Sequence, residues 1–242
     1  SETVAALPAI ISELRAEGYT FVSICGGSAF GPQVTATYGF GDAPAPAAPL
    51  TSNVPLVGAA GDGASGYWEV AADGGIFSFG DARFGGSMGG IPLNRPIVGM
   101  AATSDGGGYW EVASDGGIFS FGDARFFGSM GGIPLNRPIV GMAATPTGGG
   151  YWEVASDGGI FSFGDARFCG SMGGTPLNQP IVRMATAPGG GYWELAADGG
   201  IFSFGAPFFG SRGGESPVDR FFAMVATADG GGYLLAGQHP AT

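Results

Sequence analysis

Short apolar segments separated by glycine-rich turns run along most of this chain. In residues 96–137 they read PIVGMAAT, GYWEVAS, GIFSFG and ARFFGSM, all rich in β-branched and aromatic residues. Between the second and third segments stands Ser-Asp-Gly-Gly (114–117), a strong hairpin signal because Asp-Gly accommodates the backbone of tight turns. The pattern predicts four short strands in each stretch of about 42 residues.

This stretch is a repeat. Its tryptophans recur at intervals of 42, 42 and 41 residues, as Trp68, Trp110, Trp152 and Trp193. The unit at 96 returns almost unchanged from 138 and with more differences from 55 and 180. A shortened fifth copy begins near Arg220, and its missing part aligns with residues 38–60. Both chain ends therefore fall in one unit, which is typical of closed toroids that remove free strand edges.

We therefore predict an all-β fold, a five-bladed β-propeller of four-stranded blades closed by both ends of the chain. The front of the chain differs, because apolar residues at helical spacing predict a helix over residues 2–17, followed by a strand over 19–24. The expected organisation is this helix and strand in residues 1–25, a linker in 26–36 and the propeller in 37–242.

Composition restricts the function classes. A net charge of −11, without any lysine, argues against nucleic acid as a partner, since phosphates demand clustered cations. The sequence contains no run of about 20 apolar residues, so we predict no membrane span. The chain begins at Ser1 without a signal peptide, so we interpret it as a mature or excised fragment of a secreted protein. Cys25 and Cys169 fit one disulfide in an oxidising compartment, or two unpaired buried thiols.

Residues 2–24, ETVAALPAIISELRAEGYTFVSI, resemble the final helix and strand of NodB-type polysaccharide deacetylases. The metal site of that family uses an Asp and two His, whereas this chain has a single histidine, His239. The resemblance therefore implies a polysaccharide-modifying parent enzyme and carries no catalytic residue into this chain. The repeats resemble those appended to secreted actinobacterial cell-wall proteins. Five-bladed propellers as a class include lectins for N-acetylated sugars and arabinan-type glycosidases.

The repetition itself argues against catalysis. Glycosidases need two carboxyl groups with different pKa values, whereas most acids here recur in equivalent positions. The unrepeated acids are Glu215 and Asp219. No acidic segment fits the spacing of a calcium loop, so we expect neither a metal nor a cofactor. The glutamate of each Tyr-Trp-Glu segment is expected to pair with a repeated arginine or a tyrosine hydroxyl. The repeated tryptophans suit either the core or stacking on sugars.

The best candidate ligand site is the connection between units, GSMGGIPLNRP. On a propeller it emerges on the same face as the Asp-Gly-Gly turn. Its amide and acid side chains can hydrogen-bond sugar hydroxyl or N-acetyl groups above an apolar methionine floor. The candidate ligand-binding residues are Asn53, Asn94, Asn136, Asn178, Asp219, Arg95 and Arg137. The alternative is that each asparagine only caps the turn before proline.

These observations predict a non-catalytic, extracellular or cell-wall-associated carbohydrate-binding module attached to a polysaccharide-modifying enzyme, with a glycan as its partner. The alternative is a structural or protein-interaction module, such as an adhesin, a spacer or a self-assembling subunit. A glycoside hydrolase is the least favoured possibility. The sequence leaves the oligomeric state open.

Overall fold

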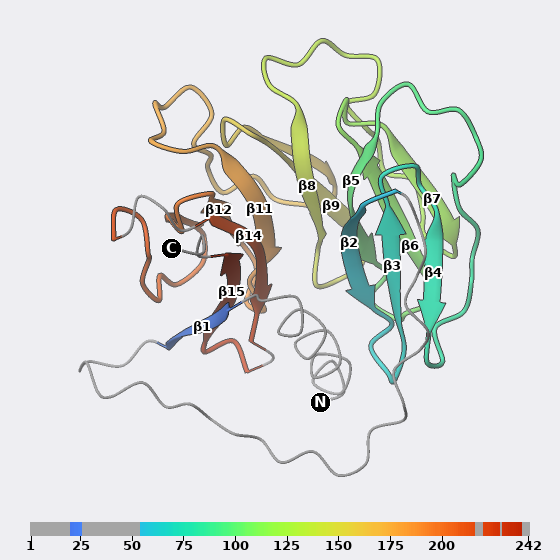
Figure 1. Cartoon of the computed structure of the whole chain (residues 1–242), viewed down its shortest axis with the longest axis horizontal. Helices are drawn as coiled ribbons and strands as arrows, with labels where there is room; N and C mark the ends of the chain where they lie inside the picture. Colours follow the sequence, from blue (N-terminus) through green and yellow to red (C-terminus); the bar gives the residue numbers. More distant parts are fainter. Residues whose placement is uncertain (1–19, 26–53, 216–219, 228, 239–242) are drawn as a thin grey trace.

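The computed structural model describes residues 20–25, 54–215, 220–227 and 229–238. These residues form strands, turns and loops, and none of them forms a helix. They make five small antiparallel sheets of three strands each, consistent with a propeller-like all-β fold (Figure 1). No helix long and apolar enough to cross a membrane occurs within these ranges.

Four sheets follow the sequence repeats, in which we number the units first (55–95), second (96–137), third (138–179) and fourth (180–215). The first sheet contains β2 (Leu56–Gly61), β3 (Tyr67–Ala71) and β4 (Ile76–Phe79). The second contains β5 (Ile97–Ala102), β6 (Gly108–Ala113) and β7 (Ile118–Gly122). The third contains β8 (Ile139–Ala144), β9 (Gly150–Ala155) and β10 (Ile160–Gly164). The fourth contains β11 (Ile181–Thr186), β12 (Tyr192–Ala196) and β13 (Ile201–Phe204).

Both ends of the chain contribute to the fifth sheet, whose order is β1 (Thr20–Cys25), β15 (Gly232–Gln238) and β14 (Arg220–Ala226). Strand β1 pairs antiparallel with β15 along its whole length, from Thr20 opposite Gly237 to Cys25 opposite Gly232. The strand predicted at 19–24 is therefore present and joins the last repeat. The predicted helix at 2–17, the linker at 26–36 and the segment 38–53 lie outside the described residues.

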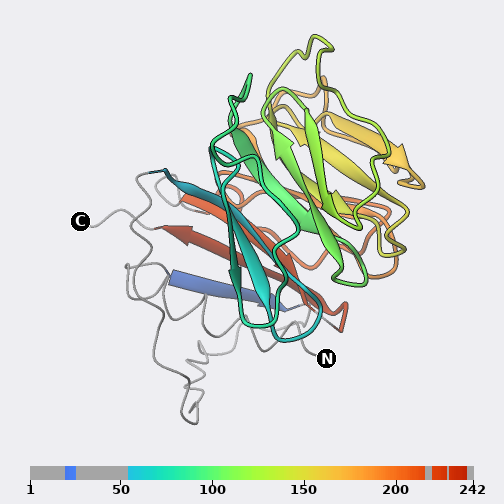
Figure 2. The ribbon, with the colours of Figure 1, turned by 90° about the vertical axis from the view of Figure 1, so that its right-hand side faces the viewer.

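The sheets follow one another around the molecule, with β2, β5, β8, β11 and β14 facing inward (Figures 1 and 2). Three of the inward strands carry glycine at the same position, where neighbouring strands lie close together. A Cβ on Gly58 would lie 3.2 Å from the Cα of Gly99, and one on Gly99 would lie 3.6 Å from that of Gly141. The fourth unit has Arg183 there, and its guanidinium donates to the carbonyls of Val57, Val140 and Val182 at 2.8–3.0 Å.

The prediction of four-stranded blades is wrong for the described sheets, which have three strands. The segment expected as the fourth strand, ARFFGSM and its equivalents, instead lies across the interface between one unit and the next. Its backbone groups are bound by side chains. The indole of Trp68 donates to the carbonyl of Arg83 (2.9 Å), and the hydroxyl of Tyr109 in the next unit donates to that of Gly86 (2.5 Å). These bonds replace the pairing that a neighbouring strand would provide.

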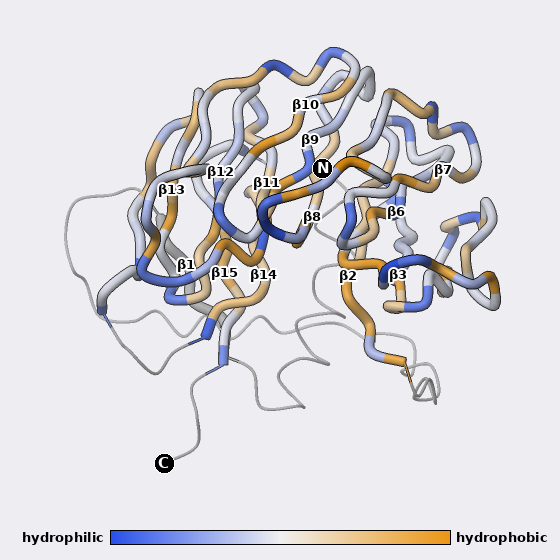
Figure 3. The backbone as a smooth tube through the Cα atoms, turned by 90° about the horizontal axis from the view of Figure 1, so that it is seen from above, coloured by the Kyte–Doolittle hydropathy of each residue, from blue (hydrophilic) through white to orange (hydrophobic). Residues whose placement is uncertain are grey.

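The hydrophobic core lies at these interfaces. At the second interface, Trp110 and Val112 of one sheet pack with Ile139 and Tyr151 of the next. The repeated tryptophans are at most 2% exposed, so they belong to the core and not to a sugar-stacking surface. Figure 3 shows the most hydrophobic stretches of the chain concentrated in the strands. The units are thus held together mainly by apolar contacts between sheets.

We expect Tyr151→Phe to lower the free energy of unfolding by about 1–3 kcal/mol, because a buried donor and acceptor lose their shared partner. The Tyr151 hydroxyl donates to the carbonyl of Gly128 (2.6 Å) and accepts from the N–H of Phe127 (3.1 Å). Urea unfolding measures the change, with the exposed substitution Phe126→Leu as control. Equal stability of Tyr151→Phe and the wild type would contradict this role.

Candidate functional site

Because the sheets are antiparallel, different turns and loops lie at the two ends of the strands. The Asp-Gly-Gly turns between the second and third strands lie at the same end as the connections between units. We call this end the turn face. The loops between the first and second strands, such as 145–149, lie at the opposite end, together with the Gly-Asp turns after the third strands. We call that end the loop face.

A groove opens on the turn face between the second and third units. Its volume is about 220 Å³, and both units line it. The connection supplies Met130, Leu135, Asn136 and Arg137, and the next hairpin supplies Asp157 and Phe161. An equivalent groove of about 170 Å³ lies between the third and fourth units. It is lined by Met172, Leu177, Asn178, Gln179, Asp198 and Phe202.

Backbone hydrogen bonds hold the two walls of the first groove in place. The N–H of Met130 donates to the carbonyl of Gly116 (3.0 Å), which ties the connection to the turn of its own unit. On the other wall, Asp157 accepts the N–H of Gly159 (3.0 Å) across its own turn, where Gly158 has a φ of 78°. Asp157, and Asp198 in the second groove, therefore stabilise their hairpins and also line the grooves.

The candidate residues from the sequence fall into three groups. Asn136, Arg137 and Asn178 line the two grooves above the predicted methionine floor. Asn94 and Arg95 are exposed at the equivalent connection before the second unit. Asn53 and Asp219 lie outside the described residues, so their place in the site stays a prediction.

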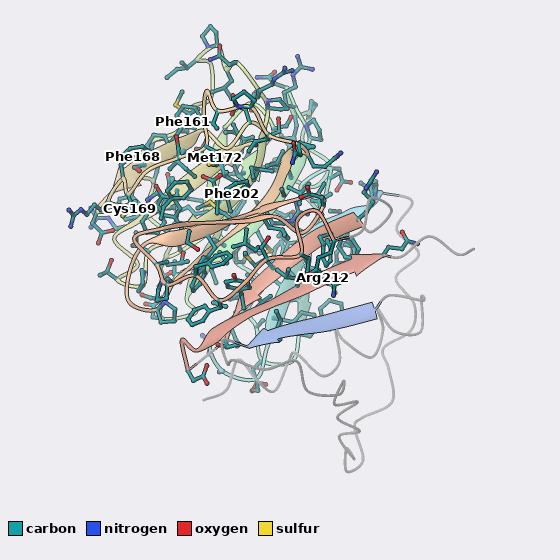
Figure 4. All side chains as sticks on the ribbon, turned by 90° about the vertical axis from the view of Figure 1, so that its left-hand side faces the viewer. Phe161, Phe168, Cys169, Met172, Phe202 and Arg212 are labelled. Atoms are coloured by element: carbon teal, nitrogen blue, oxygen red, sulfur yellow. The ribbon has the colours of Figure 1, made fainter. Side chains whose placement is uncertain are left out.

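The sequence did not identify the groove phenylalanines Phe161 and Phe202, which occupy the second position of the third strand in each unit. In Figure 4, Phe161, Met172 and Phe202 follow one another across neighbouring units, with Phe168 and Cys169 to one side. The repeated GIFSF segments contain phenylalanine at two positions, but strand alternation alone did not show which of the two faces a groove.

Glu111, Glu153 and Glu194 are fully buried at the interfaces, and none of their carboxyl oxygens has a hydrogen-bond partner among the described residues. For these three glutamates the predicted pairing with arginine or tyrosine is wrong, because the tyrosine hydroxyls bind backbone groups of the preceding unit. Burial raises the pKa of each carboxyl to about 8. For Glu153 the nearby N–H of Met130, which donates to Gly116 and not to the carboxyl, lowers the pKa, while Asp115 raises it further.

These carboxyls occupy the space left by turn glycines. A Cβ on Gly116 would lie 2.8 Å from Oε2 of Glu153, and one on Gly158 would lie 2.7 Å from that of Glu194. The glutamates are thus enclosed between one strand and the preceding turn, out of reach of a substrate. Within the described ranges, no cluster of three or more His, Cys, Asp or Glu residues is suited to a metal ion.

The thiol of Cys169 is free, and its Sγ lies 3.6 Å from the carbonyl oxygen of Arg167. Cys25 ends strand β1, but its side chain lies outside what the structure describes. A bond between Cys25 and Cys169 therefore stays a prediction.

No protein-family model matches the chain, and no curated protein matches it. Among solved structures, it is similar to a structural-genomics protein of unknown function from Bacteroides thetaiotaomicron, at 13% identity and a TM-score of 0.49. The match covers 72% of this chain and 50% of that one, so this chain spans about half of that protein's length. The similarity gives no indication of activity.

We expect stability to fall as the pH rises from about 4.5 to about 8. In this window the unfolded chain releases protons that the buried glutamates retain in the native state, so alkalinity favours unfolding. Glu153→Gln keeps a neutral group at one site and should flatten this dependence. Urea unfolding between about pH 5 and pH 8 measures it, with the exposed Glu215→Gln as control. An unchanged slope in Glu153→Gln would show that this carboxyl does not titrate in the window.

Proposed function

We propose that this chain is a non-catalytic carbohydrate-binding module whose ligand lies in the repeated grooves of the turn face. One observation carries the proposal. Two successive interfaces present the same set of groups: an asparagine amide, an aspartate carboxylate, a phenylalanine ring and a methionine floor.

This combination suits a sugar ring, which has hydroxyl groups around its edge and apolar C–H surfaces on its faces. The amide of Asn136 offers both donors and an acceptor, and the carboxylate of Asp157 accepts from hydroxyls. The ring of Phe161 and the floor at Met130 provide apolar contact. The grooves differ at one position, where Arg137 in the first corresponds to Gln179 in the second.

Repetition adds strength to sites that are individually small. The grooves occur at two successive interfaces on one face, so a polymeric ligand can occupy both of them at the same time. Each further contact is then intramolecular, and the overall affinity exceeds that of a single groove. This favours a polysaccharide, such as one of the bacterial cell wall, over a free monosaccharide.

A binding role is better supported than glycoside hydrolysis. Hydrolysis requires one carboxyl of raised pKa and one ionised carboxyl flanking the same bond. The carboxyls of raised pKa described here, Glu111, Glu153 and Glu194, are enclosed at interfaces and do not line the grooves. The groove carboxylates Asp157 and Asp198 occupy equivalent environments, which does not divide acid from base.

We also propose the finer architecture, a five-bladed propeller closed by both chain ends. Its support is the fifth sheet, to which β1 contributes from the N-terminal part of the chain, and the reach of Arg183 from β11 to Val57 of β2. We further propose that the module is secreted and belongs to a polysaccharide-modifying enzyme, on the resemblance of residues 2–24 to the deacetylase family.

The triple substitution Asn94→Ala/Asn136→Ala/Asn178→Ala tests the grooves. We expect at least about tenfold weaker binding, since each groove loses a hydrogen bond and avidity multiplies the losses. A glycan array and a pull-down with insoluble cell walls measure binding, and Ser104→Ala/Ser162→Ala is the matched control. Binding that survives the triple substitution would overturn the site. No binding by any of the proteins would overturn the carbohydrate function.

A protein-interaction role has one observation of its own. Each described unit exposes a phenylalanine at the same place after its third strand, with 58–62% of the residue accessible. These residues are Phe84, Phe126, Phe168 and Phe208. A large exposed apolar surface is typical of a contact with another protein, and these four residues are the candidates for such a surface.

Replacing these four phenylalanines with serine should abolish concentration-dependent self-association if they form an interface, because the contact loses its apolar surface. Size-exclusion chromatography with light scattering measures the effect. Ile91→Ser/Ile133→Ser changes two other exposed apolar residues and should leave association intact. A wild-type protein that remains monomeric at all concentrations would rule out self-assembly through this row.

A further inference from the structure

The interface between the third and fourth units departs from the repeat in the loop between its first two strands. Residues 186–191 are one residue shorter than their equivalents in the third unit. Elsewhere these loops touch across the interface: a Cβ on Gly148 would lie 2.5 Å from Oγ of Ser104 in the preceding unit. Gly190 of the fourth unit has a positive φ and donates its N–H to the carbonyl of Ala187, just as Gly148 does to that of Thr145, but a Cβ on it would meet nothing within 4 Å. The shortened loop is therefore withdrawn from its neighbour.

A second departure lies at the same interface. In the second unit, the ring of Phe127 packs on Trp110 and Tyr151, with centroid separations of 6.2 and 5.7 Å. Phe209 packs in the same way on Trp193 and Tyr233. Cys169 in the third unit and Gly85 in the first occupy this position, so the pairs Trp152–Tyr192 and Trp68–Tyr109 lack the third ring. Only between the third and fourth units does this absence coincide with the shortened loop.

Together the two departures open a cavity of about 590 Å³ on the loop face. This size lies within the range of small-molecule sites. Its lining combines hydroxyl groups, opposite charges, glycine backbone and apolar surface. The residues are Thr145, Pro146, Thr147, Trp152, Asp165, Arg167, Phe168, Cys169, Gly189, Gly190, Gly191 and Gly205.

The polar groups of the cavity are held in position. Oδ1 of Asp165 accepts the hydroxyl of Thr145 (2.8 Å), and Oδ2 accepts that of Thr147 (2.5 Å). Arg167 is exposed and follows two residues later. Although both side chains are described, Asp165 and Arg167 form no ion pair with each other. An acceptor and a donor of full charge therefore remain available in one cavity.

We propose that this cavity binds a short neutral saccharide of one or two rings, as a second site on the face opposite the grooves. Sugar hydroxyls donate to Asp165 and accept from Arg167, and a ring face rests on the exposed Phe168. The opposite charges balance, which favours a neutral ligand over an anionic one. The ligand class rests on the proposed function, whereas the site rests on the two departures from the repeat.

Cys169 supplies a direct probe, because its thiol lines the cavity. In a Cys25→Ser background, its rate of reaction with a disulfide reagent should fall at least about fivefold with saturating cellobiose, maltose or N,N′-diacetylchitobiose, since a bound ligand covers the sulfur. The free dipeptide glycylglycine is the comparison. Protection by the dipeptide and by no saccharide would overturn the proposal in favour of a zwitterionic ligand. Protection by neither would overturn it altogether.

Cys169→Phe is the sharpest variant, because it restores the side chain that the second unit carries at 127 and occupies the part of the cavity beside Trp152. We expect disaccharide binding, measured by calorimetry, to be lost in Cys169→Phe and retained in Cys169→Ser. Asp165→Asn should weaken binding about tenfold, because the carboxylate acceptor is lost. Undiminished disaccharide binding by Cys169→Phe would overturn the site, provided that its thermal unfolding matches the wild type.

The triple asparagine variant separates this proposal from the grooves. If the cavity is a separate site, disaccharide still protects Cys169 in that variant, although the variant no longer binds polysaccharide. Loss of disaccharide binding in the triple variant, with binding intact in Cys169→Phe, would place the saccharide in the grooves and overturn the second site.

Discussion

Apolar packing between successive sheets holds the units together, and a repeated tyrosine hydroxyl bonds each of four sheets to the one before it. Tyr109, Tyr151, Tyr192 and Tyr233 each donate to a glycine carbonyl of the preceding unit and accept a neighbouring N–H. A small isolated sheet buries too little apolar surface to be stable alone. The bond fixes the segment after the third strand, and that segment covers the interface in which the tryptophans are buried.

The proposed binding sites are of two kinds, those formed by repeated residues and the one formed where a unit departs from the repeat. Identical side chains at successive interfaces give equivalent grooves, which suit a ligand that itself repeats. Departures from the repeat, such as Cys169 and the shortened loop after β11, create a single feature at one interface. The buried glutamates belong to the repeated part, and burial raises the pKa of each because it disfavours the charged form.

Much of the fold could be predicted because its signals are local. Asp-Gly turns and alternating apolar residues marked the strands and hairpins, and the tryptophan spacing gave the units. The predicted fourth strand failed because ARFFGSM has strand-like composition, while its hydrogen-bond partners are side chains distant in sequence. The unpaired burial of Glu153 was not predicted for the same reason, because the residues around its carboxyl belong to the preceding unit. The groove asparagines were found because connections and turns alternate between the two ends of an antiparallel sheet.

Arg183 makes the structure of this otherwise repetitive chain sensitive to the number of its repeat units. Nearly identical units, such as the second and third, are prone to duplication or loss when genes recombine. The guanidinium of Arg183 reaches Val57 and Val140 at 3.0 Å each, and a side chain spans only one fixed distance. In the proposed closed ring, an added or missing unit would move Val57 away and leave a half-buried cation without one of its carbonyl partners. Through this one side chain, a change in the number of repeat units would change the stability of the protein, on which selection can act.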